Sequence, residues 1–377
     1  MKTLSRISIL CCITIVIFSC NSCKKEDKTS NNKTLLKQIE CAGNQTFFIT
    51  NDNTLWACGQ NTYGELGDGT TTQRDVPVKI MDNVKKVSSR SGHTMIIKTD
   101  NTLWACGYNY QGQLGDGANP TTTDPNPTPK QVMTDVLDVA CGYLFTLILK
   151  NDGTVWACGS NLSGQFGKST TTTNVSTPVL VNTNTKAIAA GNSHSLFLKT
   201  SNMLYAVGSN TDGQLGDGTT AQKSIPVFVM SNVSKMTAGR YHTMILKTDN
   251  TLWTVGYNGS GQLGDGTTIS KNSPIKISND VKEISNSFDN TLFLKTDNTL
   301  WNTGDNQFGA FGNGTQTNTY NTPQKIIDNI HLFGIGDKHT VVQNSNNDIL
   351  STGLDLQGQL GNGNGSSQTI FTVISFP

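Results

Sequence analysis

Four histidines are the residues whose type and spacing could most readily do chemistry. They share one place in a repeated pattern, eleven residues before its aromatic or leucine residue: His93, His194, His242 and His339. Imidazole groups can bind zinc, but zinc needs its ligands within about 2.0–2.3 Å of one point. Gln45, Phe145 and Asn290 hold the same place in other copies, and phenylalanine cannot bind a metal. We therefore predict a structural role, through hydrogen bonds to neighbouring backbone, and no metal site.

Glycine-rich turns carry four aspartates that could suggest calcium binding: Asp68, Asp116, Asp217 and Asp265. Each turn offers one carboxylate, whereas calcium takes about 6–8 oxygen ligands. Lys168, Asn313 and Asn362 stand at the equivalent positions of three other copies. The turns also lack the Gly-Lys-Ser/Thr ending of a phosphate-binding loop. The pattern favours structural turns, and we predict no cofactor.

The cysteines that follow residue 23 occupy positions typical of strands. Cys58, Cys106 and Cys158 share a place where other copies carry valine or threonine, which is typical of a half-buried strand. Cys41 and Cys141 lie seventeen residues before Cys58 and Cys158. A third strand should separate the members of each pair, which puts their backbones about 10 Å apart, beyond the ~7 Å reach of a disulfide. We therefore expect free thiols.

One unit, spaced 48–52 residues apart, is repeated seven times along the chain. Its aromatic position is filled in turn by Trp56, Trp104, Trp156, Tyr205, Trp253, Trp301 and Leu350. A fixed period in this range indicates a solenoid, propeller or array. The second unit shows four short strand-like runs, of which Pro77–Ile80 is the first and Asn101–Cys106 the last. Asp-Asn and Asp-Gly turns predict β-hairpins, and no window has helical periodicity, so the class is all-β.

Seven units of four strands predict a seven-bladed β-propeller with four-stranded antiparallel blades. The final run, Thr369–Ile374, aligns with the strand Pro77–Ile80, and the first unit, which begins at about Leu35, lacks that strand. We therefore expect the C-terminal strand to complete the first blade and close the ring. An open seven-unit solenoid is the alternative.

The repeat resembles that of the regulator of chromosome condensation (RCC1-like) family. The likeness rests on Gly107-Tyr-Asn109, Gly112-Gln-Leu-Gly115 and Gly239-Arg-Tyr-His-Thr243, and it extends over roughly residues 35–377. The resemblance implies a seven-bladed propeller. Members of this family range from a nuclear exchange factor for a small GTPase to secreted bacterial proteins, including an inhibitor of β-lactamases. Fold does not transfer function, so the resemblance leaves the activity open.

The N-terminus reads as a targeting segment. Lys2 and Arg6 precede an apolar run from Ile7 to Phe18, which is shorter than the ~20 residues of a membrane-spanning helix. The sequence around Cys20 resembles the lipobox of bacterial lipoproteins, with Cys23 as a second candidate for lipidation and an ordinary cleaved signal peptide as the alternative. We expect a signal peptide over 1–19, a polar tether over 20–33 and a propeller over 34–377, anchored by lipid in the bacterial cell envelope, at the outer membrane or cell surface.

One face of the predicted propeller gathers residues suited to protein recognition. The loops before the histidine strand and after the tryptophan strand should share this face, because connections in an antiparallel meander alternate between two sides. Tyr and Arg are enriched at interface hot spots. The candidate partner-binding residues are Arg90, Tyr108, Tyr110, Tyr143, Arg240, Tyr241, Tyr257, Phe288 and Lys338. The alternative interpretation is that these are ordinary surface loops.

The composition narrows the function classes. The formal net charge is +1 and the charges are scattered, which argues against a nucleic-acid partner. No nucleophile elbow, paired carboxylates or zinc signature occurs, so we expect no catalytic residues. The prediction is a monomeric binding module that recognises a protein partner. A surface enzyme acting on glycans or peptides at the channel is the alternative, and a guanine-nucleotide exchange factor is a further one, disfavoured by the signal peptide.

Overall fold

The computed structural model describes residues 33–118, 123–169, 171–172, 174–316 and 319–376. The chain from Thr34 onward forms one compact unit. The predicted signal peptide and both candidate lipidation sites, Cys20 and Cys23, lie outside the described residues.

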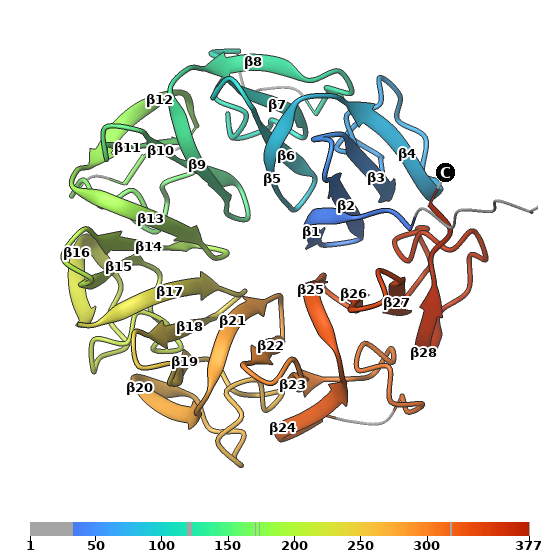
Figure 1. The fold of residues 1–377 in the computed structure, drawn as a ribbon. Coiled ribbons are helices and arrows are strands. Elements are labelled where there is room, and N and C mark those ends of the chain that lie inside the picture. The colour runs from blue at the N-terminus through green and yellow to red at the C-terminus, as the bar shows by residue number, and fades with distance from the viewer. Residues whose placement is uncertain (1–32, 119–122, 170, 173, 317–318, 377) are drawn as a thin grey trace, which may run out of the picture. The chain divides into compact units, whose positions relative to one another are not determined.

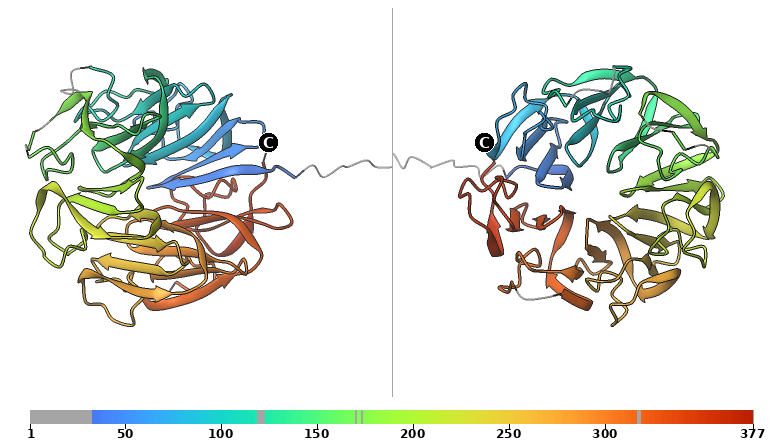
Figure 2. Two further views of the ribbon diagram at one scale, coloured as in Figure 1. Left: turned by 60° about the vertical axis from the view of Figure 1, so that its left-hand side comes forward. Right: turned by 180° about the vertical axis from the view of Figure 1, so that it is seen from behind.

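Seven antiparallel sheets of four strands each surround one axis (Figure 1). Figures 1 and 2 show the sheets arranged radially, like the blades of a propeller. Every element assigned in the described residues is a strand. The predicted all-β, seven-bladed propeller is therefore confirmed.

Each blade uses four strands that follow one another in the sequence. The first strands lie nearest the axis: β1 (Leu36–Ala42), β5 (Val84–Arg90), β9 (Val136–Cys141), β13 (Thr185–Ala190), β17 (Val233–Ala238), β21 (Val281–Asn286) and β25 (Ile330–Ile335). The second strands are β2 (Gln45–Thr50), β6 (His93–Lys98), β10 (Phe145–Lys150), β14 (His194–Lys199), β18 (His242–Lys247), β22 (Asn290–Lys295) and β26 (His339–Asn344). The third strands are β3 (Leu55–Gly59), β7 (Leu103–Gly107), β11 (Val155–Gly159), β15 (Leu204–Gly208), β19 (Leu252–Gly256), β23 (Leu300–Asp305) and β27 (Ile349–Gly353). The outer strands are β4 (Arg74–Met81), β8 (Lys130–Met133), β12 (Val175–Asn182), β16 (Lys223–Met230), β20 (Lys271–Ser278), β24 (Thr319–Ile327) and β28 (Gln368–Val373).

The hydrophobic core is divided among the contacts between neighbouring blades. In β6, Met95 and Ile97 pack between the second and third blades, whereas Ile96 points the other way and packs between the first and second. Successive side chains of a strand point to opposite faces, so a continuous apolar run buries itself in two blade contacts at once. This is why the central residues of the second strands are apolar, and why each blade relies on its neighbours to cover its apolar side chains.

The repeated Asp-Asn-Thr turns join the second and third strands. In the second blade, Asn101 adopts φ 64°, and the Asp100 carboxylate accepts hydrogen bonds from the backbone and hydroxyl of Thr102. The same hydroxyl accepts a bond of 2.9 Å from the indole of Trp104. Asparagine tolerates this left-handed backbone better than most residues, so the sequence pattern and the hairpin are directly linked. The hairpin prediction is confirmed.

One detail of the predicted ring closure is wrong. The C-terminal strand β28 pairs with β27, in the registers Ser351↔Thr372 and Leu350↔Val373, and completes the seventh blade rather than the first. The first blade takes its outer strand, β4, from the residues that follow β3. The proline-containing strand thus belongs to the blade before it. A repeat period gives the length of the unit but does not say at which strand a blade begins.

The ring closes by packing and hydrogen bonding between the seventh and first blades. Leu36, Phe48, Val341 and Ile374 share one buried cluster across this seam. The ring of Phe376 makes edge contacts with Phe48, at 5.2 Å, and with Trp56, at 5.4 Å, between ring centroids. The backbone N–H of Leu36 donates to Oε1 of Gln343 at 3.2 Å. These contacts exclude the open solenoid.

Candidate partner-binding face

One side of the propeller, called the loop face here, carries the turns between first and second strands and the loops between third and outer strands. A repeated backbone hydrogen bond holds the two kinds of loop together. Tyr108 N–H donates to Gly92 O at 2.7 Å, and Tyr257 N–H donates to Tyr241 O at 2.8 Å. The opposite side, the turn face, carries the Asp-Asn-Thr hairpins. The sequence prediction that the loops before the histidine strand and after the tryptophan strand lie together is confirmed.

Seven equivalent turn residues, one from each blade, lie on the loop face and are called the mouth ring here. Each lies two residues before the first residue of a second strand: Gly43, Ser91, Tyr143, Asn192, Arg240, Phe288 and Asp337. The flanking strands repeat almost unchanged around the ring, while this position changes in type from blade to blade. Variable loops on a rigid frame are where recognition residues concentrate.

The first cluster on the loop face is formed by tyrosines of the first three blades. Ring centroids of Tyr63 and Tyr108 lie 4.7 Å apart, and those of Tyr108 and Tyr110 lie 6.3 Å apart. Tyr110 and Tyr143 are 42% and 45% exposed. Burial raises the pKa of Tyr108, and the charges that Tyr63, Tyr110 and Tyr143 would carry raise it further. The four phenols therefore form one group.

The second cluster lies over the fifth and sixth blades. The Arg240 guanidinium stands 4.9 Å from the ring centroids of both Tyr241 and Phe288. Tyr241 in turn meets Tyr257 edge-on at 6.3 Å. A cation between two aromatic faces is held by attraction to the ring quadrupoles, so the flexible arginine is fixed in place. Lys338 is held similarly, with its Nζ 4.1 Å from the Phe308 ring.

Tyr63 and Phe308 belong to these clusters but were not predicted as site residues. Both occupy the position directly before the second conserved glycine of the repeat, where the other units carry Gln, Ser or Asp. That aromatic substitution in two units was the signal that could have identified them. Their ring contacts, with Tyr108 and Lys338, become visible only once the blades are placed.

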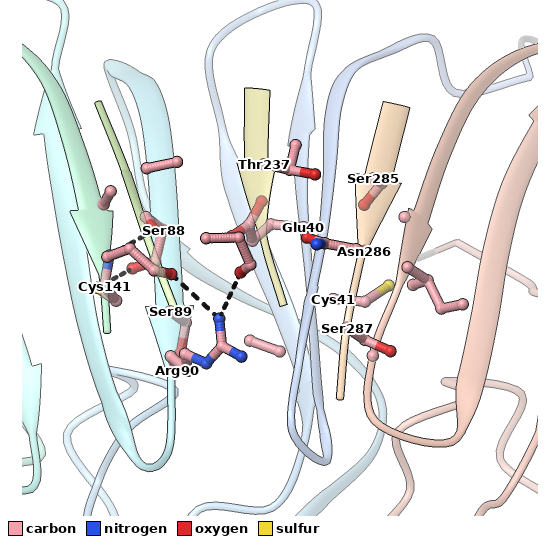
Figure 3. Close-up of a pocket in the computed structure, with 18 of the residues that line it drawn as sticks. Glu40, Cys41, Ser88, Ser89, Arg90, Cys141, Thr237, Ser285, Asn286 and Ser287 are labelled. Carbon is pink, nitrogen blue, oxygen red and sulfur yellow. Dashed lines mark hydrogen bonds between the residues drawn. The ribbon is translucent and has the colours of Figure 1, made fainter. Parts of the chain in front are cut away.

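Arg90 was predicted to present its side chain on the loop face, and this prediction is wrong. Strand β5 continues through Arg90, which pairs with His93, and the guanidinium turns into the central channel (Figure 3). There Nη1 donates to the carbonyl oxygens of Ala190 at 3.2 Å and Ala238 at 3.1 Å. Arg90 thus connects the second blade to the fourth and fifth across the channel.

The channel itself holds a cavity of about 260 Å³ lined by the first strands of all seven blades. Glu40 and Asp337 are two carboxyl groups in its wall, and burial raises the pKa of each to about 7. Gln38 Nε2 donates to Glu40 at 3.3 Å, and the Lys86–Asp138 ion pair lies close by. These groups give the channel a polar wall.

The four repeated histidines connect neighbouring blades. Nε2 of His339 lies 2.8 Å from the Thr46 hydroxyl, which itself donates to Gln359 O. The same histidine–threonine contact joins His93 to Thr146, His194 to Thr243 and His242 to Thr291. Burial lowers the pKa of His339 to about 3, so its ring stays neutral at physiological pH. The structural role fits the prediction, and the partner that all four histidines share is a threonine of the next blade.

The aspartates of the glycine-rich turns are used within the turns. Asp68 Oδ1 accepts from the Thr70 backbone at 2.9 Å and from Asn61 Nδ2 at 3.1 Å. Its second oxygen pairs with Arg74 at 2.6 Å.

The cysteines of the described residues carry free thiols, as expected: Cys41, Cys58, Cys106, Cys141 and Cys158. In the described part of the chain, no group of three or more His, Cys, Asp or Glu is arranged to hold a metal ion. The same residues contain no helical segment that could traverse a bilayer.

Comparison with known proteins agrees with this architecture. The model of the RCC1-like domain matches residues 81–376, and that of the regulator of chromosome condensation (RCC1) repeat matches residues 52–97. The fold is similar to that of human WBSCR16, with 20% identity and a TM-score of 0.74 over 86% of this chain and 94% of that one.

Two structures of a yeast protein show the same likeness. Yeast RCC1 (Prp20), in a crystal structure with Kap60, gives 18% identity and a TM-score of 0.75 over 97% of this chain and 91% of that one. Prp20p from Saccharomyces cerevisiae gives 20% identity and a TM-score of 0.74, over 91% of this chain and 88% of that one. At these identities the structures show likeness of fold alone. The domain match spans most of the propeller, and the chain belongs to the RCC1-like domain family.

Proposed function

We propose that this propeller is a binding module of the bacterial cell envelope that recognises a protein partner through its loop face. The observation that carries the proposal is the pair of aromatic clusters there, one of tyrosines and one around Arg240, with exposed side chains in the same loops. Tyr110, Tyr143, Leu162 and Leu356 are 42%, 45%, 60% and 69% exposed, and all belong to loops of this face. Aromatic and cationic side chains at the centre of a polar rim are typical of protein interfaces.

The turn face differs in kind. It carries a repeated hydrogen bond between lysine and the asparagine of the hairpin, as in Lys85 with Asn101 at 2.8 Å and Lys37 with Asn53 at 2.6 Å. Lysine is depleted at interface cores. The contrast between the faces favours the loop face as the contact surface.

The relatives support binding to proteins as a use of this architecture. Yeast RCC1 (Prp20) is described in complex with Kap60, and the study of Prp20p describes its binding to Gsp1p and histones. These partners are those of the yeast protein. For the present chain we infer the general mode, a propeller that binds a protein, and not the identity of the partner.

The proposal is tested by partner capture from the envelope fraction of the native host. We expect Tyr110→Ala and Arg240→Ala each to lower recovery of the specific partner about tenfold or more, the effect of removing an interface hot spot. Lys85→Ala and Lys186→Ala are the matched controls and should leave recovery unchanged, because Lys186 bonds to Asn202 on the turn face as Lys85 does to Asn101. Thermal unfolding of every variant shows that the fold is intact. Equal recovery by the loop-face variants and wild type contradicts the proposal.

We also propose that lipid on Cys20 anchors the propeller in the envelope. The support is the sequence Ile17-Phe18-Ser19-Cys20 after an apolar run, with the polar segment 20–33 as tether. In cells fed an alkyne-labelled fatty acid, Cys20→Ser should abolish labelling of the protein, and Cys23→Ser should retain it. Labelling that survives Cys20→Ser and disappears with Cys23→Ser places the anchor at the other cysteine. Labelling of neither wild type nor variants rejects the anchor.

A further inference from the structure

A separate pocket opens on the loop face beside the channel mouth. Its cavity is about 360 Å³ and lies over the first three blades, with Asp337 of the seventh blade on its far wall. Gly43, Gln45, Tyr63, Tyr108 and Tyr143 line it. Gly43 leaves it open, because the other six blades have a side chain at this place in the mouth ring. We call this cavity the tyrosine pocket.

Two oxygen acceptors flank the space above Gly43. A Cβ atom built on Gly43 would lie 3.4 Å from Gln45 Oε1 and 4.0 Å from Asp337 Oδ2. Gln45 is 3% exposed, and its Oε1 has no hydrogen-bond partner in the described residues. Its amide nitrogen is already used, since Nε2 lies 3.3 Å from Glu65 Oε1. A buried acceptor without a donor is costly, so this oxygen is a place where a ligand donor gains binding energy.

The cations nearest to the pocket make their direct contacts elsewhere, although the charges of Arg90, Lys338 and Arg240 still act on the Asp337 carboxyl group. Arg90 donates across the channel to carbonyl oxygens of the fourth and fifth blades. Lys338, next to Asp337 in the sequence, lies over the Phe308 ring. Within the described residues the Asp337 carboxylate has no ion-pair partner and accepts no hydrogen bond. The pocket therefore combines a carboxyl group, an amide oxygen without a hydrogen-bond partner and aromatic rings, which together match a cation when the carboxyl group is ionised.

We propose that the tyrosine pocket receives the guanidinium of an arginine side chain from the protein partner. The inference rests on the proposed function of the loop face and names the chemistry of what it binds. A planar guanidinium can stack on the tyrosine rings while its N–H groups reach both acceptors, which the compact ammonium of lysine cannot do equally well. The molecule already contains this arrangement, in Arg240 between Tyr241 and Phe288. In the first blade the corresponding residue is Gly43, which leaves this place open to an arginine from a partner.

The first blade departs from the repeat at residues in and beside the tyrosine pocket. Gln45 stands where four blades carry the histidine that bonds to the next blade, and Glu65 stands where five other units carry glutamine. Glu65 holds the tyrosine loop, because its Oε2 accepts the Tyr63 N–H at 2.7 Å. Gly43 and Gln45 thus line the pocket, and Glu65 supports it from behind through Gln45 and Tyr63.

The test uses the full chain labelled with 3-fluorotyrosine and titrated with N-acetyl-arginine amide, followed by fluorine NMR. N-acetyl-citrulline amide is the matched ligand, since it keeps the shape and loses the charge. We expect the arginine compound to shift the resonances of Tyr63, Tyr108 and Tyr143, and the citrulline compound to bind at least about tenfold more weakly. Asp337→Asn should weaken arginine binding by about tenfold or more. Lys85→Ala, on the turn face, should leave it unchanged.

A second variant and a pH series test arginine binding independently, in case Asp337→Asn changes the structure around the channel mouth. Gly43→Asn fills the gap with a residue that tolerates φ 55°, and should also block binding. Cation binding needs the charged carboxylate, whose pKa is about 7, so affinity should fall as the pH is lowered from 8 to 6. Four other charged groups influence the pKa of this carboxyl group: Arg90, Lys338 and Arg240 lower it, and Asp289 raises it. The fall should disappear in Asp337→Asn.

The outcomes separate this inference from the proposed function. Equal binding of the arginine and citrulline compounds, or arginine binding unaffected by both pocket variants, overturns the arginine pocket. If that occurs while Tyr110→Ala still loses the partner, the loop-face function stands without this pocket. Arginine binding as expected together with partner capture that ignores every loop-face variant overturns the function instead. If Asp337→Asn also loses partner capture, the tyrosine pocket is part of the surface that binds the partner.

Discussion

Replacing Gly59 with alanine is expected to lower the free energy of unfolding by about 3–5 kcal/mol. Gly59 has φ 109°, and a Cβ atom there would lie 2.2 Å from the carbonyl oxygen of Asn44. That same carbonyl accepts the hydrogen bond from Gln60 N–H that fixes the loop face. The backbone oxygen cannot move without losing this bond, so the side chain must be accommodated by distortion of the blade. Urea denaturation followed by tryptophan fluorescence measures the loss.

Gly69→Ala is the matched control for this prediction. It lies in the same blade, at φ 81°, but nothing lies within 4 Å of the Cβ that alanine would add. Only the backbone conformation opposes this substitution, at a cost of about 1–2 kcal/mol. Similar denaturation midpoints for the two variants would contradict the close approach of the two loops at Gly59.

The second large effect is expected at the seam of the ring. Ile374→Ala together with Phe376→Ala should lower the free energy of unfolding by about 4–6 kcal/mol, because both side chains fill the contact between the last and first blades. Ile374 is 4% exposed, and Phe376 packs on Phe48 and Trp56. Thermal unfolding and urea denaturation should both show the change.

Val373→Ala is the neighbour that serves as control at the seam. Val373 is 62% exposed although it directly precedes Ile374, so its substitution should change the stability by less than about 1 kcal/mol. If the double variant behaved like the control, the ring would not be held by this packing.

The architecture could be predicted because the signals for it are local and repeated. Each Asp-Asn-Thr turn specifies a hairpin, and each apolar second strand specifies burial on both sides. The strand at which each blade begins could not be predicted in the same way. Whether the strand Arg74–Met81 pairs with β3 or β5 depends on contacts between segments, and the repeat pattern is the same in either case.

The candidate face was predicted in outline, and single residues within it were not. Tyr108, Tyr110 and Arg240 were identified from residue type and from the alternation of loops. Arg90 was misplaced because the length of β5 decides whether its side chain meets the loop face or the channel, and one residue of strand reverses the direction. The importance of Asp337 depends on Gly43, which lies almost three hundred residues away in the sequence, next to it across the seam.

The most direct test of the central claim, that the loop face binds a protein, is site-specific photo-crosslinking in the native host. A photoreactive phenylalanine at Tyr110 should form a covalent adduct of one discrete mass with the partner, because that ring is exposed on the loop face. The same residue placed at Lys85, on the turn face, should form none. Adducts from Lys85 and not from Tyr110 would contradict the account.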